Sequence, residues 1–174
     1  MLGFEVIQQA SVQLTAAQVG AFYPAEAKSA NWATVLKYML SDKVLALVLK
    51  RDLGEVVEQL LHVVGPDSKE DWSQPTHSRT LRGRFAEGKA SPLLDAVHAS
   101  KSATQAKHEI QQIFKDDLAS QQQSLFACVL PDVVSKGFGP AVIASLRKVH
   151  TTQHKNSTKP SYTHHSHSPA LEIS

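Results

Sequence analysis

The sequence predicts an α/β sandwich, a domain in which helices cover a small β-sheet. Residues 44–49 form a continuous apolar run, which is typical of a strand buried on both faces. On either side of this run, apolar residues recur at helical spacing in residues 32–40 and 53–64. Strand and helix patterns thus alternate along a chain of 174 residues, which is long enough for one domain with a sizeable core.

Two shorter elements precede these patterns. Residues 4–9 indicate a strand. Thr15 and Gln18 have the T-x-x-Q spacing of a capping box, in which two side chains satisfy backbone N–H groups at a helix start. A short helix is therefore expected to begin there. The helix pattern of residues 53–64 should end at the Gly-Pro pair of residues 65–66.

The middle of the chain is polar before it becomes regular again. Residues 66–92 are expected to form a long loop around a short helix at residues 80–85. A strand is expected at residues 94–99. Ser102 and Gln105 repeat the capping-box spacing, so another helix should begin after them.

The last third of the chain divides into a linker, a strand–helix unit and a tail. Residues 115–123 are polar and are expected to be a linker, whereas residues 124–149 contain a second apolar strand pattern and a final helix. Residues 150–174 are rich in Thr, Ser, Lys and His and should be disordered or held by a partner. Their histidines could bind zinc or nickel, but their spacing matches no specific metal motif and favours a solvated tail.

Composition narrows the classes of function. A net charge of +2 gives no case for binding nucleic acid, and no apolar run reaches the roughly 18 residues of a membrane span. The N-terminus lacks a basic stretch followed by an apolar one, so no secretory signal is expected. The single cysteine, Cys128, excludes an intrachain disulfide and fits the reducing cytoplasm.

Several linked segments resemble the nucleoside diphosphate kinase family. Residues 80–85 give an arginine-containing turn. Residues 95–102 resemble the pattern N-x-x-H-G-S-D-S and keep its His and both Ser residues, and residues 106–110 add a helical Glu-Ile pair. Residues 3–49 resemble the family's second strand, the helices after it and its third strand. The resemblance implies a ferredoxin-like α/β sandwich with an antiparallel four-stranded sheet, whose main part is residues 1–114.

The family's opening strand, K-P-D turn and first helix are absent before Gly3, but residues 125–149 resemble them. In the family this strand lies inside the sheet, so leaving it out would expose backbone groups that each cost about 1–3 kcal/mol if buried unpaired. Residues 124–149 are thus expected to fill the gap. They do so either within the same chain, as a circular permutation, or in a neighbouring copy, as a domain swap or tandem fragment. The permutation is preferred, because residues 115–123 can span about 30 Å when extended.

The resemblance also implies a chemistry. In the family, a neutral histidine attacks the terminal phosphate of a nucleoside triphosphate, and a nucleoside diphosphate then accepts the phosphoryl group. His98 matches that nucleophile, Glu109 the carboxylate that orients its imidazole, and Ser100 a serine of the same motif. Without the motif, His98 would be a packed strand-end histidine and Glu109 a solvated helix residue.

Four further residues match nucleotide-binding positions. Arg82 corresponds to a phosphate-binding arginine, and Tyr23 to an aromatic residue near the histidine. Trp32 lies near the position that stacks on the base, and Asp95 replaces an asparagine that contacts sugar and phosphate. The plainer alternatives are a surface cation for Arg82 and core packing for Tyr23 and Trp32.

Other positions depart from the family in ways that weaken phosphate binding. Leu130 replaces the lysine of K-P-D, Leu61 falls at a second phosphate-binding arginine, and Asp67 falls near a phosphate-contacting threonine. One lost charged contact to phosphate costs about 1.5–3 kcal/mol. Two lost cations and two added carboxylates, at Asp67 and Asp95, predict a damaged phosphate pocket. Ala99 and Lys101 replace a glycine and an acidic residue of the histidine motif.

We therefore expect a catalytically impaired family member that acts as a structural or interaction module. It would bind protein partners in a larger assembly such as the ciliary axoneme, where the resemblance suggests that degenerate members occur, and it could form homo-oligomers. The alternative is an active nucleoside diphosphate kinase that uses Mg²⁺ with ATP or ADP and forms phosphohistidine at His98. A third hypothesis is a nucleotide-binding regulator without turnover.

Overall fold

The computed structural model describes residues 3–51, 55–67, 76–85, 96–115 and 124–148. Their strands form one antiparallel four-stranded sheet in the order β1-β2-β4-β3. The strands are β1 (Glu5–Val12), β2 (Val44–Lys50), β3 (Val97–Ala99) and β4 (Leu125–Val129). The expected α/β sandwich with a four-stranded antiparallel sheet is confirmed.

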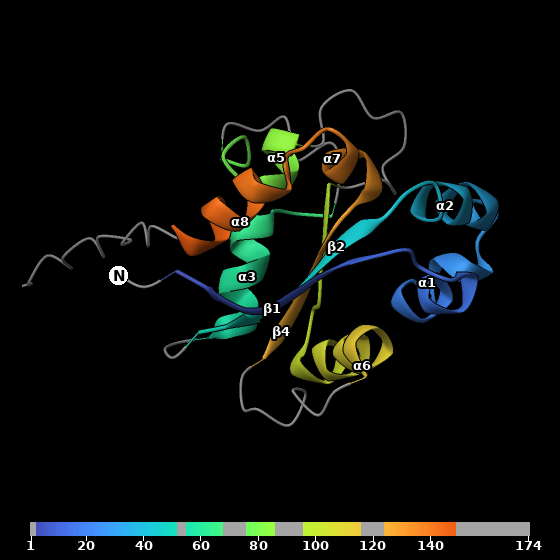
Figure 1. Cartoon of the computed structure of the whole chain (residues 1–174), viewed down its shortest axis with the longest axis horizontal. Coiled ribbons are helices and arrows are strands. Elements are labelled where there is room, and N and C mark those ends of the chain that lie inside the picture. Colours follow the sequence, from blue (N-terminus) through green and yellow to red (C-terminus); the bar gives the residue numbers. More distant parts are fainter. Residues whose placement is uncertain (1–2, 52–54, 68–75, 86–95, 116–123, 149–174) are drawn as a thin grey trace, which may run out of the picture.

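Helices cover both faces of this sheet (Figure 1). One face carries α1 (Ala16–Phe22) and α6 (Ala103–Phe114). The other carries α3 (Val56–Val64) and α8 (Gly139–Arg147). The smaller elements are α2 (Trp32–Met39), the 3₁₀ turn η1 (Glu26–Lys28), α5 (Leu81–Phe85) and α7 (Pro131–Ser135).

Local sequence signals explain where the helices begin and end. The Thr15 hydroxyl accepts from Gln18 N at 3.3 Å, and the Gln18 side chain accepts from Thr15 N at 2.9 Å, so this capping box is complete. At the start of α6, Ser102 accepts from Gln105 N at 3.1 Å. The side chain of Gln105 accepts from Lys101 N instead of Ser102 N, so this second cap is only half of a capping box.

The strand β1 reaches further along the chain than the sequence predicted, and the last helical region contains one more helix. The strand expected at residues 4–9 continues to Val12 in β1. The final helix begins at Gly139, where the resemblance to the family's first helix also begins, and a separate helix, α7, precedes it. Pro131 starts α7 because its fixed φ suits a first helical turn and its missing N–H has no helical partner to lose. Of the expected strand at 94–99, the described part is β3.

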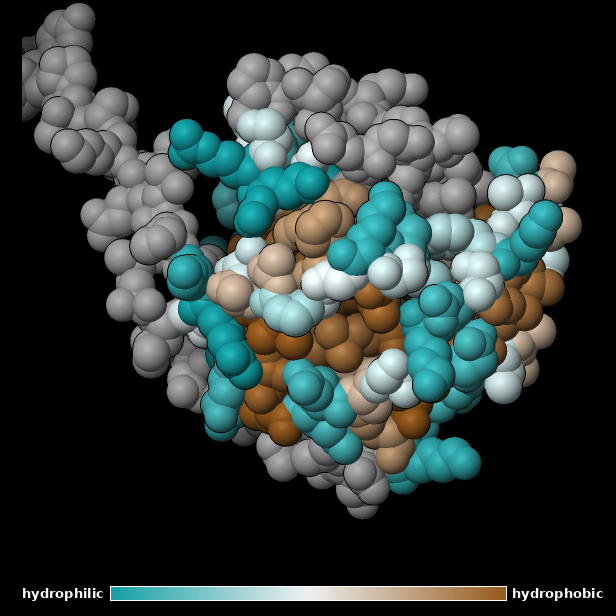
Figure 2. Space-filling model, turned by 45° about the horizontal axis from the view of Figure 1, so that its top comes forward, coloured by the Kyte–Doolittle hydropathy of each residue, from teal (hydrophilic) through white to brown (hydrophobic). Residues whose placement is uncertain are grey.

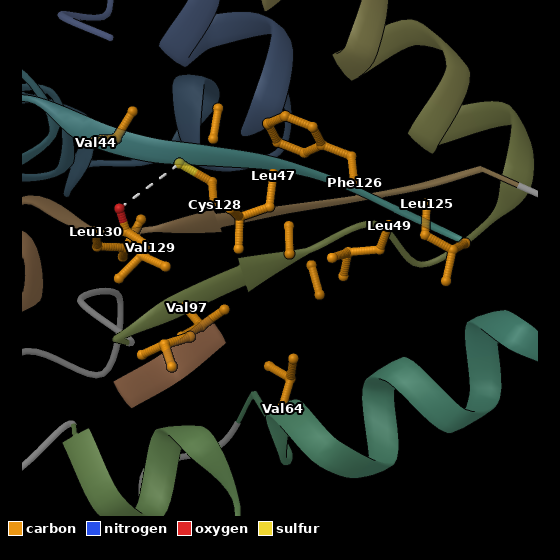
Figure 3. Close-up of a cluster of buried hydrophobic side chains, with 14 of the residues drawn as sticks. Val44, Leu47, Leu49, Val64, Val97, Leu125, Phe126, Cys128, Val129 and Leu130 are labelled. Carbon is orange, nitrogen blue, oxygen red and sulfur yellow. Dashed lines mark hydrogen bonds between the residues drawn. The ribbon is translucent and has the colours of Figure 1, made fainter. Parts of the chain in front are cut away.

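The strand β4 occupies the interior of the sheet. It pairs antiparallel with β2 on one side, where Ala46 is opposite Cys128, and with β3 on the other, where His98 is opposite the same cysteine. All of its residues are buried, and their side chains join those of β2, β3 and α3 in the core (Figure 3). In this structure β4 therefore holds the inner position between β2 and β3.

The first described residues lie beside the end of α8. Phe4 N donates to the carbonyl oxygen of Leu146 at 3.0 Å. A Cβ atom added to Gly3 would lie 2.0 Å from the carbonyl oxygen of Arg147, so only glycine permits this close approach. The beginning of β1 and the end of α8 are therefore neighbours in space, although they are far apart in the sequence.

The outer surface is mixed in polarity. Figure 2 shows hydrophobic side chains gathered in the middle of one face, with hydrophilic side chains around them. Among the described residues, Phe138 is the large hydrophobic side chain that is most exposed, at 44%, and its ring lies 5.5 Å from that of Phe85. Within the described ranges, no helix has the length and apolar character needed to cross a bilayer.

Candidate functional site

The imidazole of His98 lies in an aromatic enclosure. His98 is the central residue of β3 and is 7% exposed. Its ring stacks on Phe22 with centroids 5.7 Å apart, and it meets the edge of Tyr23 at 5.2 Å. Phe126 of β4 lies 6.2 Å away. Tyr23 is thus next to the histidine, as the sequence predicted.

A single buried carboxylate holds the polar groups of this site. Glu109, on α6, is completely buried. Its Oε1 lies 2.8 Å from Nε2 of His98 and accepts from Nε2 of Gln105, also at 2.8 Å. Its Oε2 accepts from the hydroxyl of Ser100. The structure therefore brings His98, Glu109 and Ser100 together, as the sequence predicted, and adds Gln105.

This arrangement fixes the tautomer of the histidine. A carboxylate only accepts hydrogen bonds, so Nε2 of His98 carries the proton that it donates to Glu109. In the neutral imidazole, Nδ1 then holds the lone pair, and no hydrogen-bond donor within the described part of the chain contacts it. An oriented imidazole with a basic Nδ1 is chemically able to act as a nucleophile.

Glu109 stays ionised despite its burial. Burial alone raises the pKa of this carboxyl, because a charged group is poorly solvated there. The hydrogen bond and charge of His98, with the hydrogen bonds from Ser100 and Gln105, outweigh that effect and lower the pKa below its ordinary value. The carboxylate can therefore orient the imidazole at neutral pH.

Cys128 lies opposite His98 in the sheet but is unreactive. Its side chain is fully buried, and its Sγ is 3.9 Å from the carbonyl oxygen of Val129 (Figure 3). Burial and the negative charge of Glu109 raise the pKa of the thiol far above its ordinary value. Since the thiolate is the nucleophilic form of cysteine, Cys128 is a core residue.

Arg82 is buried rather than a surface cation. It lies on α5, is 3% exposed, and donates through Nε to the carbonyl oxygen of Val97 at 3.1 Å. One of its terminal nitrogens donates to the carbonyl oxygen of Gly65 at 2.7 Å and to the carboxylate of Asp67 at 2.6 Å. The guanidinium thus supports the backbone beside His98 and is already paired with an anion.

The carboxylate of Asp67 joins two cations. Its Oδ1 lies 2.6 Å from Arg82, and its Oδ2 lies 2.5 Å from Nζ of Lys101. Burial raises the pKa of this carboxyl, but the hydrogen bond from Lys101 and the positive charges of Arg82 and Lys101 lower it below its ordinary value overall. Asp67 is therefore negatively charged at neutral pH.

Three further predicted positions lie in or against the hydrophobic core. Leu130 is fully buried at the start of α7, and its N–H donates to the carbonyl oxygen of Ala96 at 3.0 Å. Leu61 lies half-buried on α3. Trp32 begins α2 and packs partly buried against the core, and none of the contacts among the described residues joins it to His98. Asp95 lies outside the described residues.

Two side-chain contacts were not predicted from the sequence. Gln105 lies four residues before Glu109 on α6, a spacing that places the two side chains on one helix face and could have predicted their contact. The hydroxyl of Tyr38 donates to the carboxylate of Asp132, which joins α2 to α7. No sequence signal links those two residues. Over the described ranges, no cluster of His, Cys, Asp and Glu could hold a metal ion.

With the fold and the histidine site described, comparison with known proteins identifies the family of this domain. The family model "Nucleoside diphosphate kinase" matches residues 1–118. The chain therefore belongs to the nucleoside diphosphate kinase family. The matched segment ends before β4 and α8.

Known relatives are moderately similar to this chain. A "Probable nucleoside diphosphate kinase 5" from Arabidopsis thaliana is 30% identical over 124 residues, which cover 69% of this chain and 82% of the relative. A "Nucleoside diphosphate kinase homolog 5" from Danio rerio is 30% identical over 112 residues, covering 64% of this chain and 49% of the relative. A "Nucleoside diphosphate kinase" from Staphylothermus marinus is 27% identical over 116 residues, covering 66% and 75%. No solved structure gives a significant match.

Proposed function

We propose that this chain is a catalytically impaired nucleoside diphosphate kinase domain that serves as a structural or interaction module. The observation that carries the proposal is the pairing of Arg82. Its guanidinium is buried and contacts two backbone carbonyls and the carboxylate of Asp67. Leu130, at the position of the family's K-P-D lysine, offers only hydrocarbon.

These surroundings fit a nucleotide poorly. Phosphoryl transfer depends mainly on positioning and on neutralising the charge of the phosphate groups. A nucleotide would have to displace the carboxylate of Asp67 from Arg82 and would meet no ammonium at Leu130. Each missing charge-assisted contact costs about 1.5–3 kcal/mol. ATP or ADP with Mg²⁺ therefore has few partners here.

The alternative is an active kinase, and the contacts of His98 favour it. Glu109 and Ser100 are arranged around His98 in a way that leaves Nδ1 basic. Under this alternative, Glu109 would orient His98 for attack on the phosphate, and the nucleotide would bind together with Mg²⁺. In this alternative, Arg82 and residues of a partner would supply the positive charge that the lost cations provide in the family.

Turnover distinguishes the two functions. The full chain would be incubated with ATP, GDP and Mg²⁺, and formation of GTP would be measured beside a His98→Ala variant. We expect no GTP above the level of that variant. Robust turnover that the substitution abolishes would establish the active kinase instead.

We also propose that residues 124–149 are the family's opening strand–helix unit, carried at the other end of the chain. Three contacts support this circular permutation. The strand β4 pairs with β2 and β3. Phe4 N donates to the carbonyl oxygen of Leu146 in α8, and the Tyr38 hydroxyl donates to the carboxylate of Asp132 in α7. A short linker from Lys148 to Gly3 should therefore be accommodated.

A re-ordered chain tests the permutation. It would place residues 124–148 first, then a short glycine-rich linker, then residues 3–115. We expect it to fold cooperatively as a monomer, with a stability close to that of the original chain. An unfolded product, or an original chain that exists only as an exchanged dimer in sedimentation, would support the domain swap.

The module role implies protein partners. Exposed apolar area that polar residues surround is a common feature of protein contact sites, and Figure 2 shows such an area. We propose a cytoplasmic assembly, with the ciliary axoneme as the location that the family resemblance suggests. Tagged protein that distributes evenly through the cytoplasm of ciliated cells, without enrichment in axonemes, would contradict that location.

A further inference from the structure

We propose that Asp67 is an internal anion that occupies a phosphate-type binding site formed by Arg82 and Lys101. On this proposal, the two cations can bind an inorganic or nucleotide phosphate group once the carboxylate is neutralised. The inference rests on the proposed function, because it gives a cause for the impaired site. It adds Lys101, which stands where the family motif has an acidic residue, as a ligand.

The geometry of the bridge resembles that of a bound anion. The two oxygens of Asp67 divide between two cations, at 2.6 Å from Arg82 and 2.5 Å from Lys101. Phosphate oxygens accept from the same donors at similar distances. The carboxylate therefore satisfies the contacts that a phosphate group would otherwise make.

The buried cation is positioned in advance. Bonds to the carbonyl oxygens of Gly65 and Val97 fix the guanidinium of Arg82, so its orientation does not depend on Asp67 alone. Since Val97 precedes His98 in β3, the cation lies next to the strand that carries the histidine. Removing the negative charge of Asp67 should leave this arrangement standing.

The position of Asp67 is also determined by the fold. Gly65 ends α3 with φ +97°, a conformation that other residues rarely adopt. A Cβ atom at Gly65 would lie 2.4 Å from the Thr80 hydroxyl oxygen. This tight turn directs the chain so that Asp67, two residues later, reaches both cations.

The site is open to solvent on one side. The side chains of Asp67 and Lys101 are 55% and 62% exposed, whereas that of Arg82 is 4% exposed. An anion from solution can therefore reach the cations from the side where Asp67 and Lys101 are exposed. Because exposed ion pairs are individually weak, the Lys101 contact can exchange readily.

Binding of inorganic pyrophosphate to the full chain tests the proposal. Isothermal titration at low ionic strength would compare the original chain with Asp67→Asn, a neutral side chain of the same shape. We expect about tenfold tighter binding or more for the variant, since it loses a competing anion and retains both cations. Asp42→Asn serves as the matched control, because Asp42 is exposed and bonds only to the adjacent N–H of Lys43 among the described contacts.

A double variant, Asp67→Asn with Lys101→Ala, identifies the ligands. We expect the gain in affinity to be largely lost in it. If Asp67→Asn does not fold by circular dichroism, Asp67→Thr provides a second neutral side chain for the same titration. An equal gain in Asp42→Asn, no gain in any neutral Asp67 variant, or tight binding by the original chain would overturn the inference.

GTP formation tests the proposed function, and the pyrophosphate titration tests the internal anion, so the two can fail separately. If the original chain makes GTP through His98, the impaired-domain proposal falls, whatever the titration shows. If the original chain is inactive and neutral Asp67 variants bind no pyrophosphate, only the internal-anion inference falls.

Discussion

Two polar regions adjoin the short strand β3, and they are built in opposite ways. Around His98, the carboxylate of Glu109 gathers three donors in a fully buried place. Around Arg82, two backbone carbonyls and the carboxylate of Asp67 accept hydrogen bonds from one buried cation. The first region orients an imidazole around one carboxylate, and the second holds a guanidinium whose charge is already paired.

The difference separates the contacts that the fold needs from the charges that phosphate binding needs. A buried carboxylate must keep its partners, because leaving it unpaired is costly to the fold. Stability alone therefore retains the Glu109 network. Arg82 is satisfied by two backbone carbonyls and Asp67, so the fold can keep this cation without a phosphate ligand. A preserved histidine network is thus weaker support for activity than preserved phosphate-binding cations.

Removing residues 124–148 should have the largest effect, because it disrupts both regions. A chain that ends at Lys115 lacks β4, which lies between β2 and β3 and supplies Phe126 beside His98. We expect no cooperative thermal transition by circular dichroism. A sharp transition close to that of the full chain would show that β4 is dispensable.

Loss of Glu109 should be the most damaging single substitution on the histidine side. In Glu109→Ala, three donors lose their acceptor and a cavity forms, so we expect a loss of about 3–5 kcal/mol in the free energy of unfolding. Urea denaturation measures it. Gln111→Ala, an exposed position on the same helix, is the control and should change the free energy by less than about 0.5 kcal/mol. Similar losses in both variants would contradict the special role of Glu109.

Leu130→Ala tests whether the K-P-D position now belongs to the core. Leu130 is fully buried, so its truncation should lower the free energy of unfolding by about 2–4 kcal/mol. Urea denaturation again supplies the measurement, with the exposed Lys136→Ala as control. A loss below 1 kcal/mol would mean that this side chain is not packed as described.

Low pH should lower the free energy of unfolding through both regions, because each contains a carboxylate whose pKa is lowered in the folded chain. Glu109 and Asp67 have pKa values lowered from 4.5 and 3.8, so the unfolded chain binds more protons than the folded one in this range. Their contribution is fully present above about pH 5 and is lost as the pH falls through the lowered values. Urea denaturation at pH 7 and pH 3.5 should show a smaller acid loss in Glu109→Gln than in the original chain. Equal losses would exclude Glu109 as a contributor.

Much of the fold could be predicted from local patterns. The apolar run of residues 44–49 became the central strand β2, and the pair of Thr15 and Gln18 formed the expected helix cap. The apolar pattern after residue 124 became β4, although only the family resemblance placed it inside the sheet. The helix α7 was missed because five residues are too few for a periodic signal.

The candidate site was only partly predictable. The motif located His98, Ser100 and Glu109, because their spacing survives in the sequence. The role of Arg82 was not visible there, since the contact with Asp67 depends on the turn at Gly65 and on how α5 packs. Long-range pairs of this kind leave no periodic pattern in a single chain.

The most direct test of the central claim is the first half of the kinase reaction. The full chain would be incubated with γ-labelled ATP and Mg²⁺, and acid-labile, base-stable phosphate on the protein would be measured beside His98→Ala. We expect no more label than in that variant, since Leu130 stands at one cation position and Arg82 is already paired with Asp67. Near-stoichiometric phosphorylation of His98 would contradict the claim that an intact histidine network stands here beside an impaired phosphate site.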